Sequence, residues 1–402
     1  MALDTGDTGF MLVATALVMI MTPGLAFFYG GLVSKKNVLT IMMQSYVSMG
    51  VTTILWVTVG YSLCFSGGAG GVIGNLDLMF LKGIGIDELY PGLDIPVLLF
   101  VVYQMMFAVI TPALITGAFA GRITFKAYLI FLVAWQLFVY FPFVHMIWGG
   151  GLLAEWGVLD FAGGIVVHAL AGMAALASVM YVGSRKNEDE SVHNVPFVAL
   201  GAALLWFGWF GFNAGSALDV GGIAVLAFIN TQIAAAFAAI TWLLIAWHRD
   251  EKPSFVEMLI GMIAGLATIT PAAGFVSPHS AMIIGVAAGT VCYFAVVYRK
   301  QKGWDDALDV WGVHGVGGAL GIVLLGVFAD KGINSAGADG LMNGNSEFFW
   351  VQLGGLAIAC VWAFGFTYMM LAAIDTITPV RVSEDDQSGV DEALHGESAY
   401  TD

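Results

Sequence analysis

The chain has 402 residues, of which 59% are hydrophobic and 11% are charged, and its formal net charge is −15. Soluble domains carry about 25% charged residues, so this composition excludes an ordinary soluble protein and indicates a chain that lies largely in lipid. The negative charge argues against nucleic acid as a partner. Cys64, Cys292 and Cys360 lie far apart, without the spacing of a metal site, so we expect neither a metal nor another cofactor.

Apolar stretches recur along the whole chain, and a helix needs about 20 such residues to cross a bilayer. We therefore predict an all-α integral membrane protein with eleven transmembrane helices. The predicted spans are 9–30, 39–63, 96–120, 125–147, 160–183, 194–216, 222–247, 255–273, 278–299, 308–329 and 347–374. The first seven residues contain two aspartates and no Lys or Arg, which is not typical of a cleaved signal peptide.

The positive residues predict the orientation of these spans. If the N-terminus is outside, 12 of the 14 Lys and Arg residues fall on the cytoplasmic side, and only Lys82 and Lys331 fall outside. Cytoplasmic loops retain Lys and Arg, so this alternation favours the predicted order of spans. Because eleven is odd, we expect a cytoplasmic C-terminus and a multi-pass protein of the cell membrane.

The spans divide into two possible repeats, at about 8–183 and 194–329, followed by an extra helix at 347–374. Five crossings in each repeat would make the second repeat inverted relative to the first. Inverted repeats usually place a substrate site near the midplane, where the repeats meet. We thus predict a transmembrane domain, 1–375, and a cytoplasmic regulatory tail, 376–402.

Glycine makes up 52 of the 402 residues and often recurs four residues apart within a predicted span. Small residues let helices approach closely in lipid. A chain this rich in glycine also produces such pairs by chance. We expect helix packing contacts at Gly117/Gly121, Gly211/Gly215, Gly261/Gly265, Gly285/Gly289 and Gly317/Gly321.

Two of the seven histidines, His168 and His314, lie inside spans, where ionisable residues are costly and become functional candidates. His168 lies ~12 Å along its helix from Asp160, and His314 lies ~8 Å from Asp309. Both occupy the fifth span of a proposed repeat, so pseudo-symmetry would bring them face to face. Alternatively, each histidine bonds a neighbouring helix. A pair of neutral imidazoles, which burial favours, would line a pore for a small neutral molecule or relay a proton.

Aromatic side chains cluster toward the outer half of the predicted membrane. Phe107 lies in the third span, Trp148 follows the fourth, and 206–212 near the end of the sixth contains five aromatic residues. Aromatic faces attract small cations, and a hydroxyl such as that of Ser216 accepts a hydrogen bond from an N–H group. The same aromatics could instead form an ordinary interfacial belt. The residues alone leave both readings open.

Five segments together resemble signatures of the Amt/Mep/Rh family of ammonium transporters, in its Amt branch. They are 22–31, 160–168, 208–216, 309–315 and 389–397. The resemblance covers nearly the whole chain, with the motifs in the right order. It implies a transporter of ammonium or ammonia, with methylammonium as an analogue. It also implies a homotrimer with one pore per subunit and a cytoplasmic PII-family regulator.

The resemblance also implies roles at the outer side of the pore. Phe107, Trp148 and Ser216 match the site that binds ammonium through cation–π contacts and a hydroxyl. Phe107 and Phe212 match a stacked gate below that site. Tyr103 departs from the family, which often has Phe there, and its phenol could add a donor or acceptor to the vestibule.

Deeper in the pore, His168 and His314 match the twin histidines of the family. Asp160 matches a carboxylate that supports the vestibule without touching the ion. Trp209 is similar to a pore-wall residue beside the gate, and Phe28 to a residue that lines the inner half of the pore. No catalytic residue is implied.

Four kinds of function are compatible with such a membrane protein. We expect transport, either as passive conduction of NH3 or as electrogenic uniport with a separately carried proton. The alternative is a PII-coupled ammonium sensor with little transport of its own. A neutral-solute pore for water or urea is a third possibility. An intramembrane enzyme is disfavoured, because no nucleophile–base pair or metal cluster is evident at membrane depth.

Overall fold

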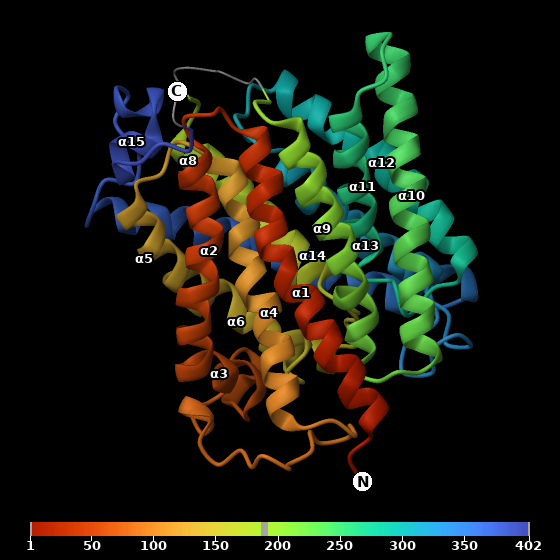
Figure 1. Cartoon of the computed structure of the whole chain (residues 1–402). Coiled ribbons are helices and arrows are strands. Elements are labelled where there is room, and N and C mark those ends of the chain that lie inside the picture. Colours follow the sequence, from red (N-terminus) through yellow and green to blue (C-terminus); the bar gives the residue numbers. More distant parts are fainter. Residues whose placement is uncertain (1, 186–191, 401–402) are drawn as a thin grey trace.

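The computed structural model describes residues 2–185 and 192–400, and within these ranges it contains helices and two isolated β-bridges but no β-strand. Residues 1 and 186–191 of the predicted transmembrane domain, and 401–402 of the predicted tail, lie outside the described residues. The longest helices run along a roughly common direction (Figure 1).

The α-helices are α1 (Thr5–Leu32), α2 (Val38–Leu55), α3 (Tyr61–Phe65), α4 (Val97–Ile115), α5 (Phe125–Trp135), α6 (Phe141–Ile147), α7 (Leu152–Glu155), α8 (Leu170–Val182), α9 (Val195–Ala214), α10 (Gly222–Asp250), α11 (Phe255–Ile269), α12 (Pro278–Gln301), α13 (Val316–Phe328), α14 (Ser346–Asp375) and α15 (Val390–His395). The π-helical segments are η1 (Trp56–Gly60), η5 (Gln136–Tyr140), η6 (Gly164–Ala169) and η8 (Trp311–Gly315). The short 3₁₀ turns are η2 (Ala69–Gly71), η3 (Met79–Leu81), η4 (Thr116–Phe119), η7 (Gly215–Ala217), η9 (Leu341–Asn343) and η10 (Asp386–Ser388). The π-helical segments join neighbouring α-helices into continuous rods, or form the first turn of a rod.

Several long helices begin at residues that are suited to the N-cap position. The side chains of Asp4, Ser254 and Asn345 each accept a hydrogen bond from the backbone N–H three residues later. Ser277 does the same for α12, where Pro278 occupies the first turn and needs no N–H partner. These caps satisfy amides that a helix start would otherwise leave unpaired.

Among the described residues, ten helical rods are long and apolar enough to cross a membrane, and they match ten of the eleven predicted spans. The remaining predicted span, 255–273, corresponds to α11, which has 15 residues. That length is below the roughly 20 residues that a full crossing needs. α11 packs against α10 and α12 inside the bundle. Its status as an eleventh crossing stays a prediction.

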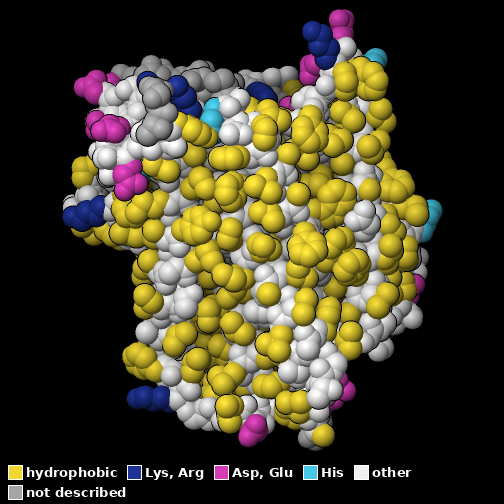
Figure 2. All heavy atoms as spheres, in the orientation of Figure 1, with side chains coloured by type: hydrophobic (Ala, Val, Ile, Leu, Met, Phe, Trp, Pro, Cys, Tyr) yellow, Lys and Arg dark blue, Asp and Glu magenta, His cyan; other side chains and the backbone are white. Residues whose placement is uncertain are grey.

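The start of α1 and the tail helix α15 lie at opposite ends of the bundle (Figure 1). We call these the N-terminal end and the tail end. Figure 2 shows hydrophobic side chains over the middle of one face, with most charged side chains near the two ends. This distribution fits a protein whose middle contacts lipid hydrocarbon, where charged groups are costly.

The tail is ordered against the loops at its end of the bundle. The buried carboxylate of Asp391 accepts hydrogen bonds from the N–H groups of Leu39 and Thr40, at 2.9 and 2.8 Å, and so caps the first turn of α2. It also accepts the Thr40 hydroxyl at 2.7 Å. Nearer the start of the tail, Val382 N donates to the carbonyl of Arg122 at 2.8 Å. The tail therefore contacts two of the loops that the sequence places in the cytoplasm.

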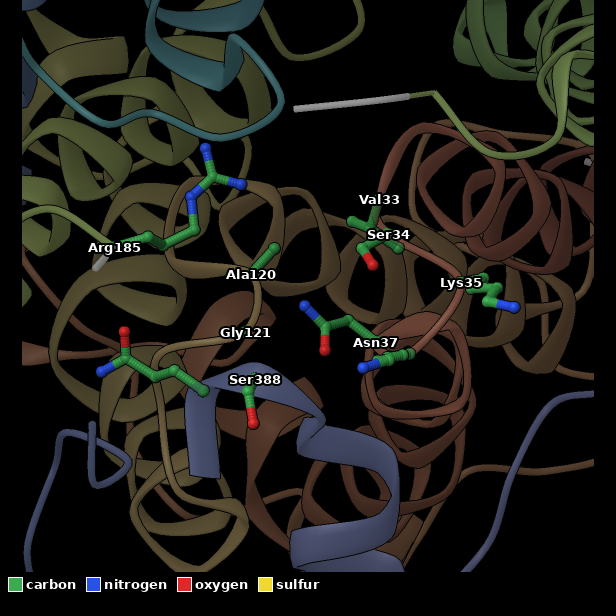
Figure 3. Close-up of a pocket in the computed structure, with 10 residues that line it drawn as sticks. Val33, Ser34, Lys35, Asn37, Ala120, Gly121, Arg185 and Ser388 are labelled. Atoms are coloured by element: carbon green, nitrogen blue, oxygen red, sulfur yellow. The ribbon is translucent and has the colours of Figure 1, made fainter. Parts of the chain in front are cut away.

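A cavity of about 280 Å³ lies between this tail and the α1–α2 connection (Figure 3). Ser34, Asn37 and Ser388 are among its lining residues. Lys35 extends away from Asn37 and Ser388 in this view. The Arg185 guanidinium is held by the carboxylate of Asp305, with Nε 2.9 Å from Oδ2. Neither Lys35 nor Arg185 is thus directed at the centre of this cavity.

The predicted glycine pairs lie at close helix contacts. A Cβ on Gly211 would come within 2.7 Å of the Ala14 carbonyl, and one on Gly321 within 2.2 Å of the Thr268 carbonyl. The other three pairs likewise have neighbours at 3.1 Å or less from at least one such Cβ. The packing interpretation is confirmed except at Gly121, which lies in a turn after η4 with a φ of +71°.

Candidate functional site

Two imidazole rings meet inside the bundle. Nδ1 of His168 lies 3.2 Å from Nδ1 of His314, and the ring planes differ by 16°. The two residues are 1% and 4% exposed. A hydrogen bond between two such nitrogens needs one ring to donate and the other to accept, so the pair shares one hydrogen. The predicted face-to-face arrangement is confirmed as geometry.

Each histidine lies in the π-helical first turn of a rod, and a carboxylate eight residues earlier binds that turn. In η6, the two oxygens of Asp160 accept four consecutive backbone N–H groups, from residues 163–166, at 2.6 to 3.0 Å. In η8, Oδ2 of Asp306 accepts the N–H of Trp311 at 2.7 Å. These carboxylates satisfy amides at helix starts and thereby fix the turns that carry the imidazoles.

The two rods that carry the imidazoles cross at glycines. A Cβ on Gly172 would lie 2.0 Å from Cα of Gly315, and one on Gly318 would lie 2.7 Å from Cβ of His168. Any side chain at these positions would push the rods apart. The short distance between the histidines therefore depends on Gly172 and Gly318, which lie one turn after His168 and His314 and have no side chain to separate the rods.

A second part of the site is a cavity of about 340 Å³, which we call the aromatic cavity. Its walls include Phe107, Trp148, Phe161 and Ser216. The rings of Phe107 and Trp148 are nearly perpendicular, at 85°, with centroids 5.7 Å apart. Trp148 Nε1 donates to the carbonyl of Asp160 at 2.8 Å, which fixes the indole beside the start of η6. The three predicted binding residues therefore share one cavity.

The predicted gate residues separate the aromatic cavity from the histidines. The rings of Phe107 and Phe212 lie with centroids 4.3 Å apart, and the Phe212 centroid is 6.1 Å from that of His168. Trp209 stacks on His168 at 5.4 Å and 19°, and its Nε1 donates to Thr270 Oγ1 at 2.9 Å. Trp209 thus forms a wall against one face of the imidazole, as its resemblance implied.

Beyond the Phe107 and Phe212 rings, a cavity of about 10 Å³ adjoins both imidazoles, and we call it the histidine cavity. Its lining is otherwise mostly apolar and includes Phe28, Leu114 and Ile263. Within the described residues, Nε2 of His168 is buried without a hydrogen-bond partner. A small solute in this cavity would therefore meet mostly apolar walls and the polar edges of the two imidazoles.

Two residues differ from the expectations drawn from the sequence. Tyr103 does not line the aromatic cavity, because its fully buried hydroxyl lies against α9, 3.0 Å from the Gly211 carbonyl. Asp306 was not identified from the sequence as the carboxylate that binds η8, because the depth of His314 was measured from Asp309. Asp309 instead binds the Arg299 guanidinium. The signal for Asp306 was its spacing of eight residues from His314, the same spacing that separates Asp160 from its histidine.

Comparison with known proteins identifies the family of this chain. A model described as the Ammonium Transporter Family matches residues 9–400. The chain belongs to the ammonium transporter family. It is 46% identical over 403 residues to an ammonium transporter of Bacillus subtilis, with 100% of each chain covered.

Solved structures with the same fold are also found. The crystal structure of Candida albicans Mep2 matches with a TM-score of 0.90 and 36% identity, over 96% of this chain and 88% of that chain. A structure named Sensor Amt Protein matches with a TM-score of 0.88 and 29% identity, over 97% of this chain and 98% of that chain. This member of the ammonium transporter family is a multi-pass membrane protein.

Proposed function

We propose that this protein transports ammonium by binding NH4+ in the aromatic cavity, removing its proton and conducting NH3 past the histidines. The observation that carries the proposal is the buried His168–His314 pair beside a narrow, mostly apolar cavity. An isolated ion in a low-dielectric medium costs tens of kcal/mol by Born estimates, whereas a neutral amine avoids that cost. Membership of the ammonium transporter family supports the same substrate.

Recruitment would use the walls of the aromatic cavity. The perpendicular rings of Phe107 and Trp148 offer π surface to a cation, and such contacts contribute about 0.5–2 kcal/mol each. Ser216 lines the same cavity and can accept a hydrogen bond from an N–H group of the ion. Stacked phenylalanines below this site would keep hydrated ions out of the passage.

The histidine pair would then receive the neutral molecule. The free Nε2 of His168 can exchange a hydrogen bond with ammonia, which replaces one that the molecule loses on leaving water. The proton either returns to the side from which it came or passes separately along the hydrogen bond between the imidazoles. Passive conduction and electrogenic uniport both fit this scheme, and an electrical recording separates them.

We further propose a homotrimeric assembly of inverted repeats, regulated at the tail end by a PII-family protein. The equal spacing of carboxylate and histidine in η6 and η8 supports the repeat. The ordered contacts of Asp391 with α2 support a regulatory tail, since a partner that moved the tail would alter the adjoining loops. Cross-linking in membranes tests the trimer.

The decisive experiment is ammonium transport in proteoliposomes with simultaneous current recording. The intact protein should carry ammonium and methylammonium but not water or urea. His168→Ala should abolish conduction or uncouple it from current, whereas His279→Ala, at an exposed position near the start of α12, should leave transport unchanged. Unchanged ammonium transport in His168→Ala would overturn the proposed mechanism.

A sensor with little transport of its own is the second candidate. The fold similarity to a structure named Sensor Amt Protein favours it as an alternative. This reading predicts ammonium-dependent binding of a partner at the tail end together with negligible uptake by the intact protein. Substantial uptake in the proteoliposome experiment would exclude it.

A further inference from the structure

A tyrosine hydroxyl lies at the end of α9, between two spans that carry the gate. Tyr103 is fully buried in α4, and its hydroxyl is 3.0 Å from the Gly211 carbonyl and 3.1 Å from the Phe212 carbonyl. The last carbonyls of a helix have no intrahelical partner of their own. At this end of α9 the Gly215 N–H reaches the Gly211 carbonyl, and the buried phenol supplies one further donor.

The same tyrosine touches both halves of the gate. It lies one helical turn before Phe107 on α4, with ring centroids 5.1 Å apart, and Phe107 lies 4.3 Å from Phe212 on α9. A Cβ on Gly215 would come within 2.6 Å of the phenol oxygen, so the chain leaves room for this hydroxyl. The phenol links the backbone that carries one gate ring to the helix that carries the other.

The phenol also contacts the hydroxyl that lines the aromatic cavity. Tyr103 Oη lies 3.3 Å from Ser216 Oγ, which in turn donates to the Phe212 carbonyl at 2.8 Å. Two hydroxyl hydrogens are present, and backbone carbonyls only accept. If the hydroxyl hydrogens of Tyr103 and Ser216 both go to backbone carbonyls, the Ser216 oxygen has two lone pairs left to accept hydrogen bonds from an ion. If the phenol donates to Ser216, the serine still keeps one.

We propose that Tyr103 is a positioning residue that fixes Ser216 and Phe212 against Phe107 and so sets how strongly the aromatic cavity distinguishes ammonium from methylammonium. This inference rests on the proposed function. If the Ser216 oxygen is held at a fixed distance from the aromatic rings, ammonium can bind in any orientation, because it has N–H groups in every direction. Methylammonium fits less well, because its methyl group cannot donate a hydrogen bond. Without the phenol hydroxyl, Ser216 and Phe212 can shift to accommodate the larger ion.

The test compares Tyr103→Phe with Tyr128→Phe. Tyr128 is a matched control, because its buried hydroxyl also donates to a backbone carbonyl, that of Gln44 at 2.6 Å, and it lines neither cavity. The measured quantity is the ratio of apparent KM values for methylammonium and ammonium in proteoliposomes. Loss of one hydrogen bond should lower that ratio roughly 2- to 10-fold in Tyr103→Phe. The ratio should not change in Tyr128→Phe.

A second readout is independent of transport. In detergent, each ion should protect the protein against thermal unfolding, and the ratio of half-saturating concentrations should change as the KM ratio does. In a Ser216→Ala background, Tyr103→Phe should add a smaller shift than it does in the intact protein, because the phenol then positions only the backbone that carries Phe212. An equal ratio in Tyr103→Phe and the intact protein, or an equal shift in Tyr128→Phe, would overturn the inference. Absence of uptake by the intact protein would instead refute the proposed function, while the protection ratios would still decide the role of Tyr103.

Discussion

The close crossing of Gly172 and Gly315 gives the sharpest prediction. A Cβ added at Gly172 would lie 2.0 Å from Cα of Gly315 and 2.1 Å from its nitrogen. Non-bonded carbon atoms settle at about 3.5–4.0 Å, so Gly172→Ala must part the two rods by about 1.5–2 Å. The histidine nitrogens, now 3.2 Å apart, would then lie beyond hydrogen-bond reach.

The stability and activity consequences of this substitution differ in size. Overpacking a close contact costs about 1–3 kcal/mol, and alanine recovers about 1 kcal/mol of helix propensity, so the fold should survive with a modest loss. Misplacing paired functional groups by about 1 Å can cost on the order of 100-fold in activity. We therefore expect Gly172→Ala to reduce ammonium conduction at least about tenfold while the protein remains folded.

Two other glycines calibrate the measurement, which combines proteoliposome uptake with thermal unfolding in detergent. A Cβ on Gly315 would lie 3.1 Å from Gly172, so Gly315→Ala needs a shift of only a few tenths of an ångström and should be milder. Gly365 in α14 has nothing within 4 Å of such a Cβ, so Gly365→Ala should behave as the intact protein does. Undiminished transport in Gly172→Ala, or a reversed order of the first two variants, would refute the reasoning.

Two further predictions concern carboxylates toward the tail end. Asp391→Ala should expose the amides of Leu39 and Thr40 to hydrogen exchange and speed proteolysis of the tail, at a cost of about 0.5–2 kcal/mol; unchanged exchange would contradict the capping role. Burial, with the nearby Asp309 carboxylate, raises the pKa of Asp306 from 3.8 to about 6. Between these values the unfolded chain loses its proton first, so the free energy of unfolding falls as pH rises, by up to about 3 kcal/mol. Asp306→Asn should remove this fall in detergent unfolding measured from about pH 4 to pH 7, and an unaltered pH profile would count against the assignment.

Much of the fold could be read from hydrophobicity and charge alone. Ten of the predicted spans match long apolar rods, because a stretch of about 20 apolar residues has few alternatives to a transmembrane helix. The exception is α11, because the apolar stretch 255–273 predicts a span there but the helix has only 15 residues, and a helix buried between neighbours can be apolar at that length. The π-helical turns η6 and η8 were also beyond prediction. They depend on where one carboxylate meets several backbone amides, which periodicity does not encode.

The candidate site divides in the same way. His168 and His314 stand out because ionisable residues at membrane depth are rare, and their matched positions predicted a meeting that the geometry confirms. Tyr103 could be recognised as unusual but not placed. The direction of its hydroxyl depends on the room left by Gly215, a residue more than a hundred positions away in the chain. Close approaches of this kind arise from tertiary packing and have no local pattern.

The histidine cavity, at about 10 Å³, is about the smallest space in which one water molecule fits. Any solute that crosses there must do so in single file, and each molecule must leave before the next arrives. Throughput would consequently saturate at high concentration even without a strong binding step. A bulkier solute would have to displace side chains from the close-packed wall of the histidine cavity. The cavity would therefore exclude such a solute through the rigidity of its wall as much as through its polarity.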